Sequence, residues 1–294
     1  MFRVCVLLSL LFRLPLVSCS AFVAPPMRWR PPTPPIPSAV PDDDWAAVII
    51  SATPTPLNAT RWSGSFRKTG RSYNATLAVF SLHNFQVAIS PNGCTNHAPT
   101  STTARSSGCA YATNGGFFDF PPHAACEGNL ITASQTRQFL APQRTNIAVN
   151  KTHAMIGYST SATVGALNTV SLVSGLGWLV RDGAAYVNSC REFPAPPSSF
   201  VTEWAPRTGA GIRADGTGLL LTVDGIEGKS SAAGSDLYEF ADLLIELGAL
   251  HAMNLDGGGS TTAVYNGTVF NRPHCADTWT VCERDVTSIT CVVA

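Results

Sequence analysis

Short apolar runs separated by turn-forming residues recur along most of the chain, and this alternation limits the folds that it can adopt. Runs of three to five residues bounded by turn signals predict β-strands. Three Asp-Gly or Asn-Gly dipeptides each lie between two such runs and supply the positive φ angles of a tight hairpin turn. We therefore expect at least three antiparallel hairpins. The runs are residues 77–80, 85–89, 146–149, 155–158, 178–180, 184–187 and 219–223, and the dipeptides are Asp182-Gly183, Asp215-Gly216 and Asn266-Gly267.

The last apolar run, residues 286–293, alternates along its length. Because successive side chains of a strand point to opposite faces, Ile289 and Cys291 share one face while Ser288 and Thr290 share the other. This pattern predicts a strand that is buried on one face only. No apolar segment long enough to cross a bilayer follows this run, so we expect no membrane anchor at the C-terminus.

One helix is predicted over residues 236–247. Asp236 and Glu239 form the D-x-x-E pattern of a capping box, and Gly248 stands where a left-handed residue ends a helix. Apolar residues recur between them at helical spacing and give one face that can pack on a sheet. Together, the runs and this helix predict an α+β fold, with mixed, largely antiparallel β-sheets and packed helices in a single domain.

The first 43 residues differ in composition from the rest. Residues 1–20 carry Arg3 and an apolar run that ends in small residues, as in a cleaved secretory signal. Arg13 interrupts this run, so an uncleaved anchor is an alternative, and residues 16–19 also resemble a bacterial lipoprotein cleavage box. Residues 21–43 form a proline-rich linker, which places the folded domain at residues 44–294.

N-glycosylation sequons favour a eukaryotic secretory route, so we expect the protein in the secretory lumen or outside the cell. Contact with a membrane is expected only if the N-terminal segment stays uncleaved. The sequons begin at Asn58, Asn74, Asn150 and Asn266.

Seven cysteines follow the predicted signal. In an oxidising compartment, seven cysteines predict three disulfides and one spare thiol. Spacing alone leaves the pairing open. The sequence contains neither a CxxC nor an HExxH motif, so we expect no metal site and no cofactor. Formal net charge is zero and charged residues are 13% of the chain, which argues against a nucleic-acid partner.

Residues 254–261, with the sequence Asn-Leu-Asp-Gly-Gly-Gly-Ser-Thr, follow a short predicted strand. Consecutive glycines let backbone N–H groups converge on an anion, so this segment predicts a phosphate-binding nest beside the Asp256 carboxylate. The alternative is a wide turn that Asp256 caps without any ligand. The substrate-binding candidates here are Asn254, Gly257, Gly258 and Ser260.

Residues 114–119, with the sequence Asn-Gly-Gly-Phe-Phe-Asp, form a second glycine motif. Amides and carboxylates bind sugar hydroxyls, and aromatic rings pack against the C–H face of a sugar. The alternative is a tight turn flanked by two core phenylalanines. The substrate-binding candidates here are Asn114, Gly115, Gly116 and Asp119.

Arg207 opens a predicted strand and can hold two phosphate oxygens, although a surface ion pair is the common role of a single arginine. Asp224 ends the apolar run 219–223. Because glycosidic cleavage commonly uses two carboxyl groups, we predict Asp224 and Asp256 as the catalytic pair, with Glu127 and Glu203 as substitutes. We expect Arg207 and Asp256 to meet in one pocket, of which residues 114–116 form another wall.

Six segments occur here in the same order as in a known family, and the chain therefore resembles the phosphodiester glycosidases. The resemblance covers roughly residues 75–294. The segments are residues 109–118 with 126–129, residues 174–179, residues 205–208, Asp224-Gly225, residues 254–261, and the three cysteines Cys275, Cys282 and Cys291.

The resemblance implies hydrolysis of an α-N-acetylglucosaminyl phosphodiester on a glycoprotein or glycan, which leaves a phosphomonoester such as mannose 6-phosphate. It implies a substrate-binding place for Glu127, and disulfides Cys94–Cys126, Cys109–Cys291 and Cys275–Cys282, with Cys190 spare. The animal enzyme continues into a cysteine-rich module, a membrane span and a tail, which this sequence lacks. A secreted glycan-binding module without turnover and a structural cell-surface protein are the alternatives.

Overall fold

The computed structural model describes residues 43–91, 93–120, 125–140, 144–193, 195–227, 233–275 and 282–294. The predicted signal and the predicted linker, apart from Asp43, lie outside these residues. In the part of the chain that is described, no helix has the length and apolar character needed to cross a membrane.

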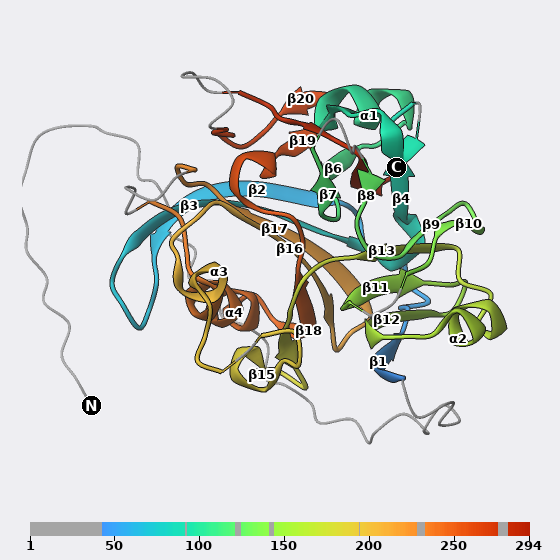
Figure 1. Ribbon diagram of the computed structural model, residues 1–294, viewed down its shortest axis with the longest axis horizontal. Coiled ribbons are helices and arrows are strands. Elements are labelled where there is room, and N and C mark those ends of the chain that lie inside the picture. The colour runs from blue at the N-terminus through green and yellow to red at the C-terminus, as the bar shows by residue number, and fades with distance from the viewer. Residues whose placement is uncertain are drawn as a thin grey trace, which may run out of the picture. The chain divides into compact units, whose positions relative to one another are not determined.

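Three larger sheets make up most of the described structure, and their strands pair antiparallel throughout (Figure 1). The six-stranded sheet has the order β1 (Asp44–Ile49), β12 (His153–Tyr158), β11 (Asn146–Val149), β13 (Ser171–Ser174), β9 (Leu130–Thr132) and β10 (Gln135–Gln138). The seven-stranded sheet has the order β15 (Ala184–Ala185), β14 (Trp178–Arg181), β18 (Ala249–Asn254), β16 (Arg207–Arg213), β17 (Thr217–Val223), β3 (Ser72–Ser81) and β2 (Asn58–Ser65). The five-stranded sheet has the order β20 (Thr268–Val269), β19 (Ala263–Tyr265), β6 (Tyr111–Asn114), β22 (Ser288–Val292) and β4 (Phe85–Ile89).

Smaller elements connect these sheets. Two strand pairs lie outside them, β5 (Ala98–Pro99) with β21 (Asp285–Val286) and β7 (Phe118–Asp119) with β8 (Ala125–Cys126). The α-helices are α1 (Thr100–Ser106), α2 (Ser161–Ala166), α3 (Ser199–Thr202) and α4 (Leu237–Glu246), and the short 3₁₀ helices are η1 (Leu82–Asn84), η2 (Gly93–Thr95), η3 (Val187–Ser189) and η4 (Gly258–Ser260).

Each large sheet directs one face into a shared core, to which Ile156, Leu220 and Tyr111 belong. The opposite face packs with residues of a helix: α2 on the six-stranded sheet, α4 on the seven-stranded sheet and α1 on the five-stranded sheet. Strand β17 has apolar residues at successive positions because both of its faces are buried. Leu220 faces the shared core, and Leu219 faces α4. A strand that is buried on both faces needs apolar residues at successive positions.

The three predicted hairpins are confirmed. Asp182-Gly183 connects β14 to β15, Asp215-Gly216 connects β16 to β17, and Asn266-Gly267 connects β19 to β20. Asp182 and Asn266 both adopt positive φ, as the type of turn inferred from the dipeptides requires.

Helix α4 also forms where the capping signal placed it. The Asp236 side chain accepts a hydrogen bond from the Glu239 N–H, and the Glu239 side chain accepts one from the Asp236 N–H. Gly248 follows the helix with a φ of +89°, a conformation that a residue with a side chain rarely adopts. These local signals therefore set both ends of the helix.

The prediction for the last strand is wrong in one respect. Strand β22 is buried on both faces, since Ser288 and Thr290 are as inaccessible as the apolar residues between them. It lies between β6 and β4, and the Thr290 hydroxyl is 2.7 Å from the Thr113 hydroxyl. Alternation in the sequence indicated a solvent-facing side, whereas the Thr113 hydroxyl bonds Thr290 and the Gly116 N–H donates to the Ser288 hydroxyl inside the protein.

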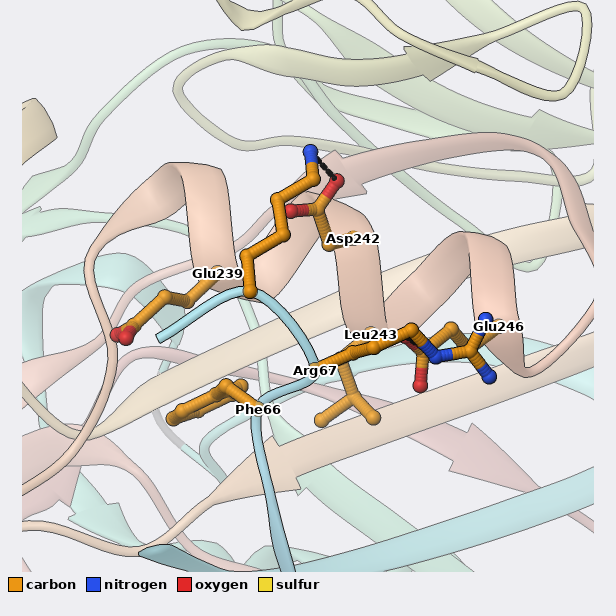
Figure 2. A pocket seen from close by; sticks show the side chains of 7 residues that line it. Phe66, Arg67, Glu239, Asp242, Leu243 and Glu246 are labelled. Carbon is orange, nitrogen blue, oxygen red and sulfur yellow. Dashed lines mark hydrogen bonds and ion pairs between the residues drawn. The ribbon is translucent and has the colours of Figure 1, made fainter. Parts of the chain in front are cut away.

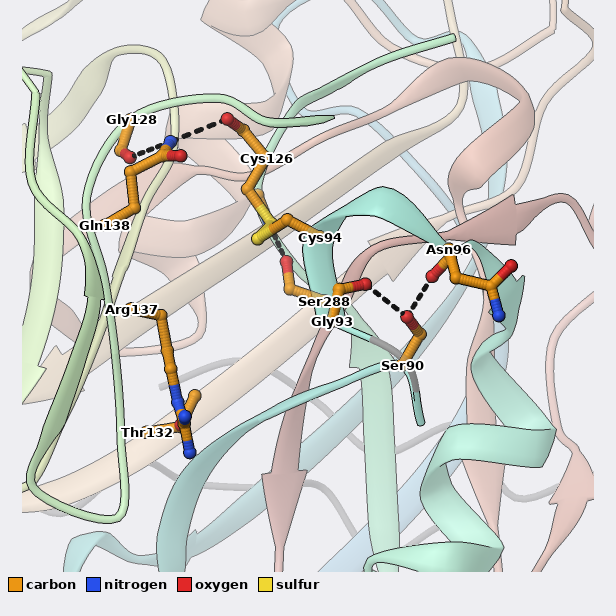
Figure 3. The surroundings of a disulfide bond; sticks show 11 residues. Ser90, Gly93, Cys94, Asn96, Cys126, Gly128, Thr132, Arg137, Gln138 and Ser288 are labelled. Atoms are coloured by element: carbon orange, nitrogen blue, oxygen red, sulfur yellow. Dashed lines mark hydrogen bonds between the residues drawn. A yellow bond between two sulfur atoms is a disulfide. The ribbon is translucent and has the colours of Figure 1, made fainter. Parts of the chain in front are cut away.

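The three disulfides have the pairing that the resemblance implies, and Cys190 is the buried free cysteine. Cys94–Cys126 connects η2 to β8, as Figure 3 shows. In the same view the Gln138 amide donates to the carbonyl groups of Cys126 and Gly128 at 2.6 and 2.8 Å. The segment around Glu127 is therefore fixed on both sides.

Candidate active site

The ends of β18 and β6 meet at Asp256. The Asp256 N–H donates to the Gly115 carbonyl at 3.1 Å, and the Asn114 amide nitrogen donates to the Asp256 carbonyl at 2.7 Å. Strand β18 lies inside the seven-stranded sheet and β6 inside the five-stranded sheet. These bonds therefore join two sheets and bring together the two glycine motifs found in the sequence.

The two asparagines of these motifs lie beneath the Asp256 carboxyl group, with their side chains fully buried. The Asn114 oxygen accepts hydrogen bonds from the Thr208 hydroxyl at 2.8 Å and the Thr262 N–H at 3.2 Å. The Asn254 amide nitrogen donates to the Leu176 carbonyl at 3.2 Å. Asn114 thus binds the protein's own groups through both of its polar atoms, whereas the buried side-chain oxygen of Asn254 has no hydrogen-bond partner among the described residues.

The N–H groups of the loop after Asp256 are used inside the protein. The Gly257 N–H donates to the Asp256 carboxylate at 2.9 Å, and the Gly258 N–H donates to the Pro206 carbonyl at 2.8 Å. The Ser260 N–H donates to the Gly257 carbonyl at 3.1 Å. The Gly257 and Gly258 N–H groups thus have partners inside the protein, and the predicted phosphate nest of this loop stays a prediction.

The glycines of this loop instead allow an ion pair to approach the backbone. A Cβ atom at Gly259 would lie 2.5 Å from the Glu227 carboxylate and 2.6 Å from the guanidinium carbon of Arg284. Those two side chains form an ion pair at 2.7 Å, in which Arg284 is 10% exposed. A side chain at position 259 would therefore have to displace the Glu227 carboxylate and the Arg284 guanidinium.

Sequence reasoning missed both members of this ion pair. Glu227 lies three residues after Asp224 in the same turn region, and that proximity was an available signal. No local pattern marks Arg284. It reaches the glycine loop because the segment after Cys282 folds back against it.

The surroundings of Asp256 favour its protonated form. Protein atoms surround the carboxyl group, and this burial raises its pKa to about 7, with a smaller contribution from the negative charge of Glu127. A hydrogen bond from the Ser260 hydroxyl, the positive charge of Arg284 and the Gly257 N–H act in the opposite direction. Asp256 therefore exchanges a proton near neutral pH, as a general acid or base must.

Glu127 provides the second carboxyl group of the site. It follows Cys126 of the Cys94–Cys126 disulfide and pairs with Arg144 at 2.5 Å, and both side chains are about one third exposed at 31%. Its backbone N–H donates to the Phe117 carbonyl at 2.9 Å. The site thus contains two carboxyl groups, those of Glu127 and Asp256, and two cations, Arg144 and Arg284.

The predicted role of Arg207 as a phosphate ligand needs correction. Its side chain is 1% exposed, and its guanidinium donates to the carbonyl groups of Ser235, Phe200 and Glu203 at 2.9 to 3.1 Å. Burial lowers its pKa to about 10. Arg207 therefore binds three backbone carbonyl groups, and its guanidinium is buried inside the protein. Glu203 accepts one of these hydrogen bonds through its backbone carbonyl, and its negative charge acts against the lowering of the Arg207 pKa.

Asp224 belongs to a different polar group from Asp256. Its carboxylate accepts hydrogen bonds from the Asn271 amide at 3.0 Å and the Arg272 N–H at 3.1 Å, and it lies 3.7 Å from Arg61. Burial raises its pKa, against the effect of these partners. The charges that act on Asp256 come from Arg284 and Glu127. These contacts favour Glu127, the substitute that the sequence offered, over Asp224 as the second carboxyl group beside Asp256.

The remaining candidates of the second motif have separate positions. A Cβ at Gly115 would lie 2.6 Å from the Ser288 hydroxyl, and one at Gly116 would lie 2.5 Å from the Ser174 carbonyl, so both glycines permit close packing. Asp119 is exposed at the end of β7. Next to it, Phe120 is 52% exposed and its ring lies 5.1 Å from the Arg284 guanidinium.

Other charged groups of the described residues lack the arrangement of a reaction centre. Within those ranges, no three His, Cys, Asp or Glu side chains are grouped so as to hold a metal ion. Figure 2 shows a small hollow between the β2–β3 hairpin and α4, where Lys68 pairs with Asp242 at 2.8 Å and Arg67 with Glu246 at 3.2 Å. Both cations are largely exposed, so these pairs act at the surface.

Comparison with known proteins gives consistent matches. The curated relatives include the N-acetylglucosamine-1-phosphodiester alpha-N-acetylglucosaminidase of Bos taurus, 35% identical over 69% of this chain and 40% of the relative. They also include the Homo sapiens protein of that name, 33% identical over 77% of this chain and 47% of the relative. The chain therefore spans less than half the length of either relative.

Solved structures show the same fold. The catalytic domain of the zebrafish N-acetylglucosamine-1-phosphodiester alpha-N-acetylglucosaminidase, auto-inhibited by its pro-peptide, superposes with a TM-score of 0.75 at 26% identity, over 86% of this chain and 88% of that one. A hypothetical protein from Synechocystis shares the fold at a TM-score of 0.63 and 15% identity, over 85% of this chain and 68% of that one.

The family model for phosphodiester glycosidases matches residues 107–293. This range contains Glu127, Asp256 and Arg284, which meet around the glycine loop. With the relatives and the shared fold, this match shows that the chain belongs to the phosphodiester glycosidase family.

Proposed function

We propose that this chain hydrolyses sugar-1-phosphodiesters, with α-linked N-acetylglucosamine as the sugar and a phosphomonoester as the second product. The observation that carries the proposal is the Asp256 carboxyl group, whose pKa is raised to about 7 between Arg284 and Glu127. The names of the curated relatives support the choice of sugar. A phosphoglycan such as one that leaves mannose 6-phosphate fits this chemistry as the acceptor.

In the proposed reaction, a water oxygen bonds to the anomeric carbon C1 of the sugar. The bond between C1 and the phosphate oxygen breaks, and its electron pair leaves with the phosphate. One proton of the water is transferred to a carboxylate or to the departing phosphate. The net products are the free sugar and the phosphomonoester.

Asp256 is the proposed proton donor or acceptor, because a carboxyl group with a pKa near 7 populates both protonation states at neutral pH. Glu127 is the second carboxyl group and carries the negative charge that an oxocarbenium-like centre at C1 attracts. The Arg144 partner of Glu127 keeps that side chain oriented. A phosphate needs less protonation than a sugar alkoxide on leaving, so one proton-exchanging carboxyl group suffices.

Arg284 replaces Arg207 as the proposed phosphate ligand. It stands beside the glycine loop and its positive charge acts on Asp256. A preorganised cation stabilises negative charge that grows on the leaving phosphate in the transition state. Phe120, exposed beside Arg284, offers a ring face to the sugar or the acceptor.

The test uses N-acetylglucosamine 1-phosphate esterified to a simple alcohol, with hydrolysis in ¹⁸O-labelled water. Cleavage at C1 places the label in the released sugar, whereas cleavage at phosphorus places it in the phosphate. We expect label in the sugar, and its loss with Asp256→Asn. Label in the phosphate would overturn the proposal in favour of a phosphodiesterase that attacks phosphorus. No turnover by folded protein would overturn it in favour of a glycan-binding module.

We also propose a secretory or extracellular location, with residues 1–20 as a signal, residues 21–43 as a linker and residues 44–294 as one catalytic domain. Three disulfides support an oxidising compartment. Mass spectrometry of the secreted protein tests the cleavage site, since a mature N-terminus near residue 21 is expected.

A further inference from the structure

A second cavity lies on the outer face of the six-stranded sheet, between the β9–β10 hairpin and α2. Its volume is about 280 Å³, close to the lower end of the roughly 300–1,000 Å³ typical of small-molecule sites. None of the residues that line it belongs to the Asp256 site. The family's reaction therefore leaves this cavity without an assigned role.

The walls of this cavity, which we call the α2 pocket, have a distinct chemistry. Its lining includes hydroxyl and amide side chains together with the ring of Phe139, and none of the lining residues is charged. The polar members are Ser134, Thr136, Ser161, Asn168 and Thr169. Such walls bind neutral groups that both donate and accept hydrogen bonds and that also carry an apolar face.

One polar group in the α2 pocket lacks a partner inside the protein. Thr169 is only 5% exposed, and its hydroxyl has no hydrogen-bond partner among the described residues. A buried hydroxyl without a partner costs about 1–3 kcal/mol. The hydroxyl itself has almost no accessible surface, so a ligand hydroxyl in the pocket supplies the missing bond only when the Thr169 side chain rotates toward it.

The rim of the pocket is held in place. The Ser134 N–H donates to the Val170 carbonyl at 2.8 Å and so ties the β9–β10 turn to the segment that follows α2. Ser134 and Asn168, on opposite sides, adopt φ angles of +62° and +50°. Both angles belong to ordinary turns, since Ser134 follows Ala133 in the tight β9–β10 turn and Asn168 stands just after the end of α2. These turns and the hydrogen bond from Ser134 to Val170 fix the rim of the pocket.

From these observations we propose that the α2 pocket binds one neutral sugar unit of a glycan, separately from the catalytic centre. A sugar ring presents hydroxyls to the polar wall and a C–H face to Phe139. Glu127 of the active site and Ile131 of the pocket are four residues apart, which spans at most about 14 Å of chain. An oligosaccharide can therefore reach both sites.

The test is built on two neighbouring positions of α2. Gly165 lines the pocket and a Cβ there meets no atom within 4 Å, so Gly165→Phe fills the cavity without a backbone clash. Ala166 is exposed and lies outside the lining, so Ala166→Phe adds the same ring to the same helix as a matched control. Neither position belongs to the catalytic site.

Binding of methyl α-mannopyranoside and of methyl β-N-acetylglucosaminide is measured by saturation-transfer NMR and calorimetry. We expect a dissociation constant on the order of 1 mM for at least one of them at the α2 pocket. Gly165→Phe is expected to weaken that binding at least about tenfold, while Ala166→Phe leaves it unchanged. Thr169→Val, which keeps the shape but removes the hydroxyl, is expected to weaken it about fivefold to tenfold.

Two results would overturn the proposal. One is equal sugar binding by the wild type, Gly165→Phe and Thr169→Val, which would place all binding elsewhere. The other is stronger binding of glucose 6-phosphate than of glucose with the same dependence on Gly165, which would mean a site for anions. If Gly165→Phe fails to fold by far-UV circular dichroism, Thr169→Val carries the test alone. Turnover of the simple phosphodiester is also measured for both α2 variants. If turnover is retained while the α2 pocket binds no sugar, the proposal for the pocket fails and the proposed reaction stands.

Discussion

Glu127 and Asp256 act on each other electrostatically, although they come from distant parts of the chain and follow strands of different sheets. The negative charge of Glu127 helps to hold a proton on Asp256, and Arg144 and Arg284 stand next to the two carboxyl groups. The two carboxyl groups therefore have different expected roles, with Asp256 exchanging a proton and Glu127 carrying negative charge. Variants of the site are expected to differ accordingly.

Asp256→Asn is expected to lower kcat by about 10²-fold or more, because it removes a proton-exchanging group while keeping the side-chain shape. Asp224→Asn is the matched control, since Asp224 also follows an apolar strand but contacts Asn271 and Arg272. It should retain kcat within about tenfold and reduce thermal stability instead. Sugar release and thermal unfolding are measured for both. Equal losses of kcat would contradict the assignment.

The pH profile of kcat/KM is expected to show an apparent pKa of about 7 that belongs to Asp256. If Asp256 acts as the acid, activity falls as the pH rises through this value. This fall in activity around pH 7 should be absent from the residual activity of Asp256→Asn. A profile without any inflection between pH 6 and 8 would argue against a role of Asp256 in proton transfer.

Stability should change with pH in a direction that follows from the same carboxyl group. Its pKa is about 7 in the folded protein against an ordinary 3.8, so the folded state binds the proton more tightly. The stabilising effect is complete below pH 3.8 and is lost as the pH rises through 7. Asp256→Asn cannot ionise, so its free energy of unfolding should improve relative to the wild type between pH 4 and 8. Urea unfolding across this range measures the difference, and a constant difference would contradict the raised pKa.

Arg284 and Arg207 are expected to affect different properties. Arg284→Ala should lower kcat by about 10²-fold to 10³-fold, with partial recovery in Arg284→Lys, because a point charge replaces the planar guanidinium. Arg207→Ala removes the donor for three backbone carbonyl groups and should cost about 3 kcal/mol or more of stability. Kinetics and chemical unfolding distinguish the two effects. A stable Arg207→Ala protein with greatly reduced kcat would restore the phosphate role to Arg207.

The free thiol provides a check on the disulfides. In protein that lacks residues 1–20, and with them Cys5 and Cys19, native thiol titration should detect no reactive group because Cys190 is 2% exposed. After unfolding without reductant, one thiol per chain should react. Three thiols or more would mean that a disulfide is absent.

Local signals in the sequence were sufficient for much of the fold. Asp182-Gly183 and the Asp236 capping box act within a few residues, so the hairpin and helix followed from the sequence. Strand β22 was misjudged because the groups that cover Ser288, at Gly115 and Gly116, are distant from it in the sequence. Burial of a polar residue depends on partners that no local pattern reveals.

The same reason limited the prediction of the site. The two glycine motifs were identified because glycine and carboxylate clusters are visible in the sequence, and Asp256 does lie between them. Arg207 was misassigned because a sequence shows a charge but not the direction in which the side chain extends. Arg284 was missed since its approach to Gly259 arises only when the C-terminal segment packs against the glycine loop.

The position of β22 has a consequence for how the protein is made. This strand supplies Ser288, against which Gly115 packs, and it lies between β6 and β4 although residues 288–292 are synthesised long after both. During synthesis β6 and β4 emerge without the strand that separates them, and their unpaired edges need protection from other chains. The packing of Gly115 against Ser288 is thus completed only after residues 288–292 have been translated.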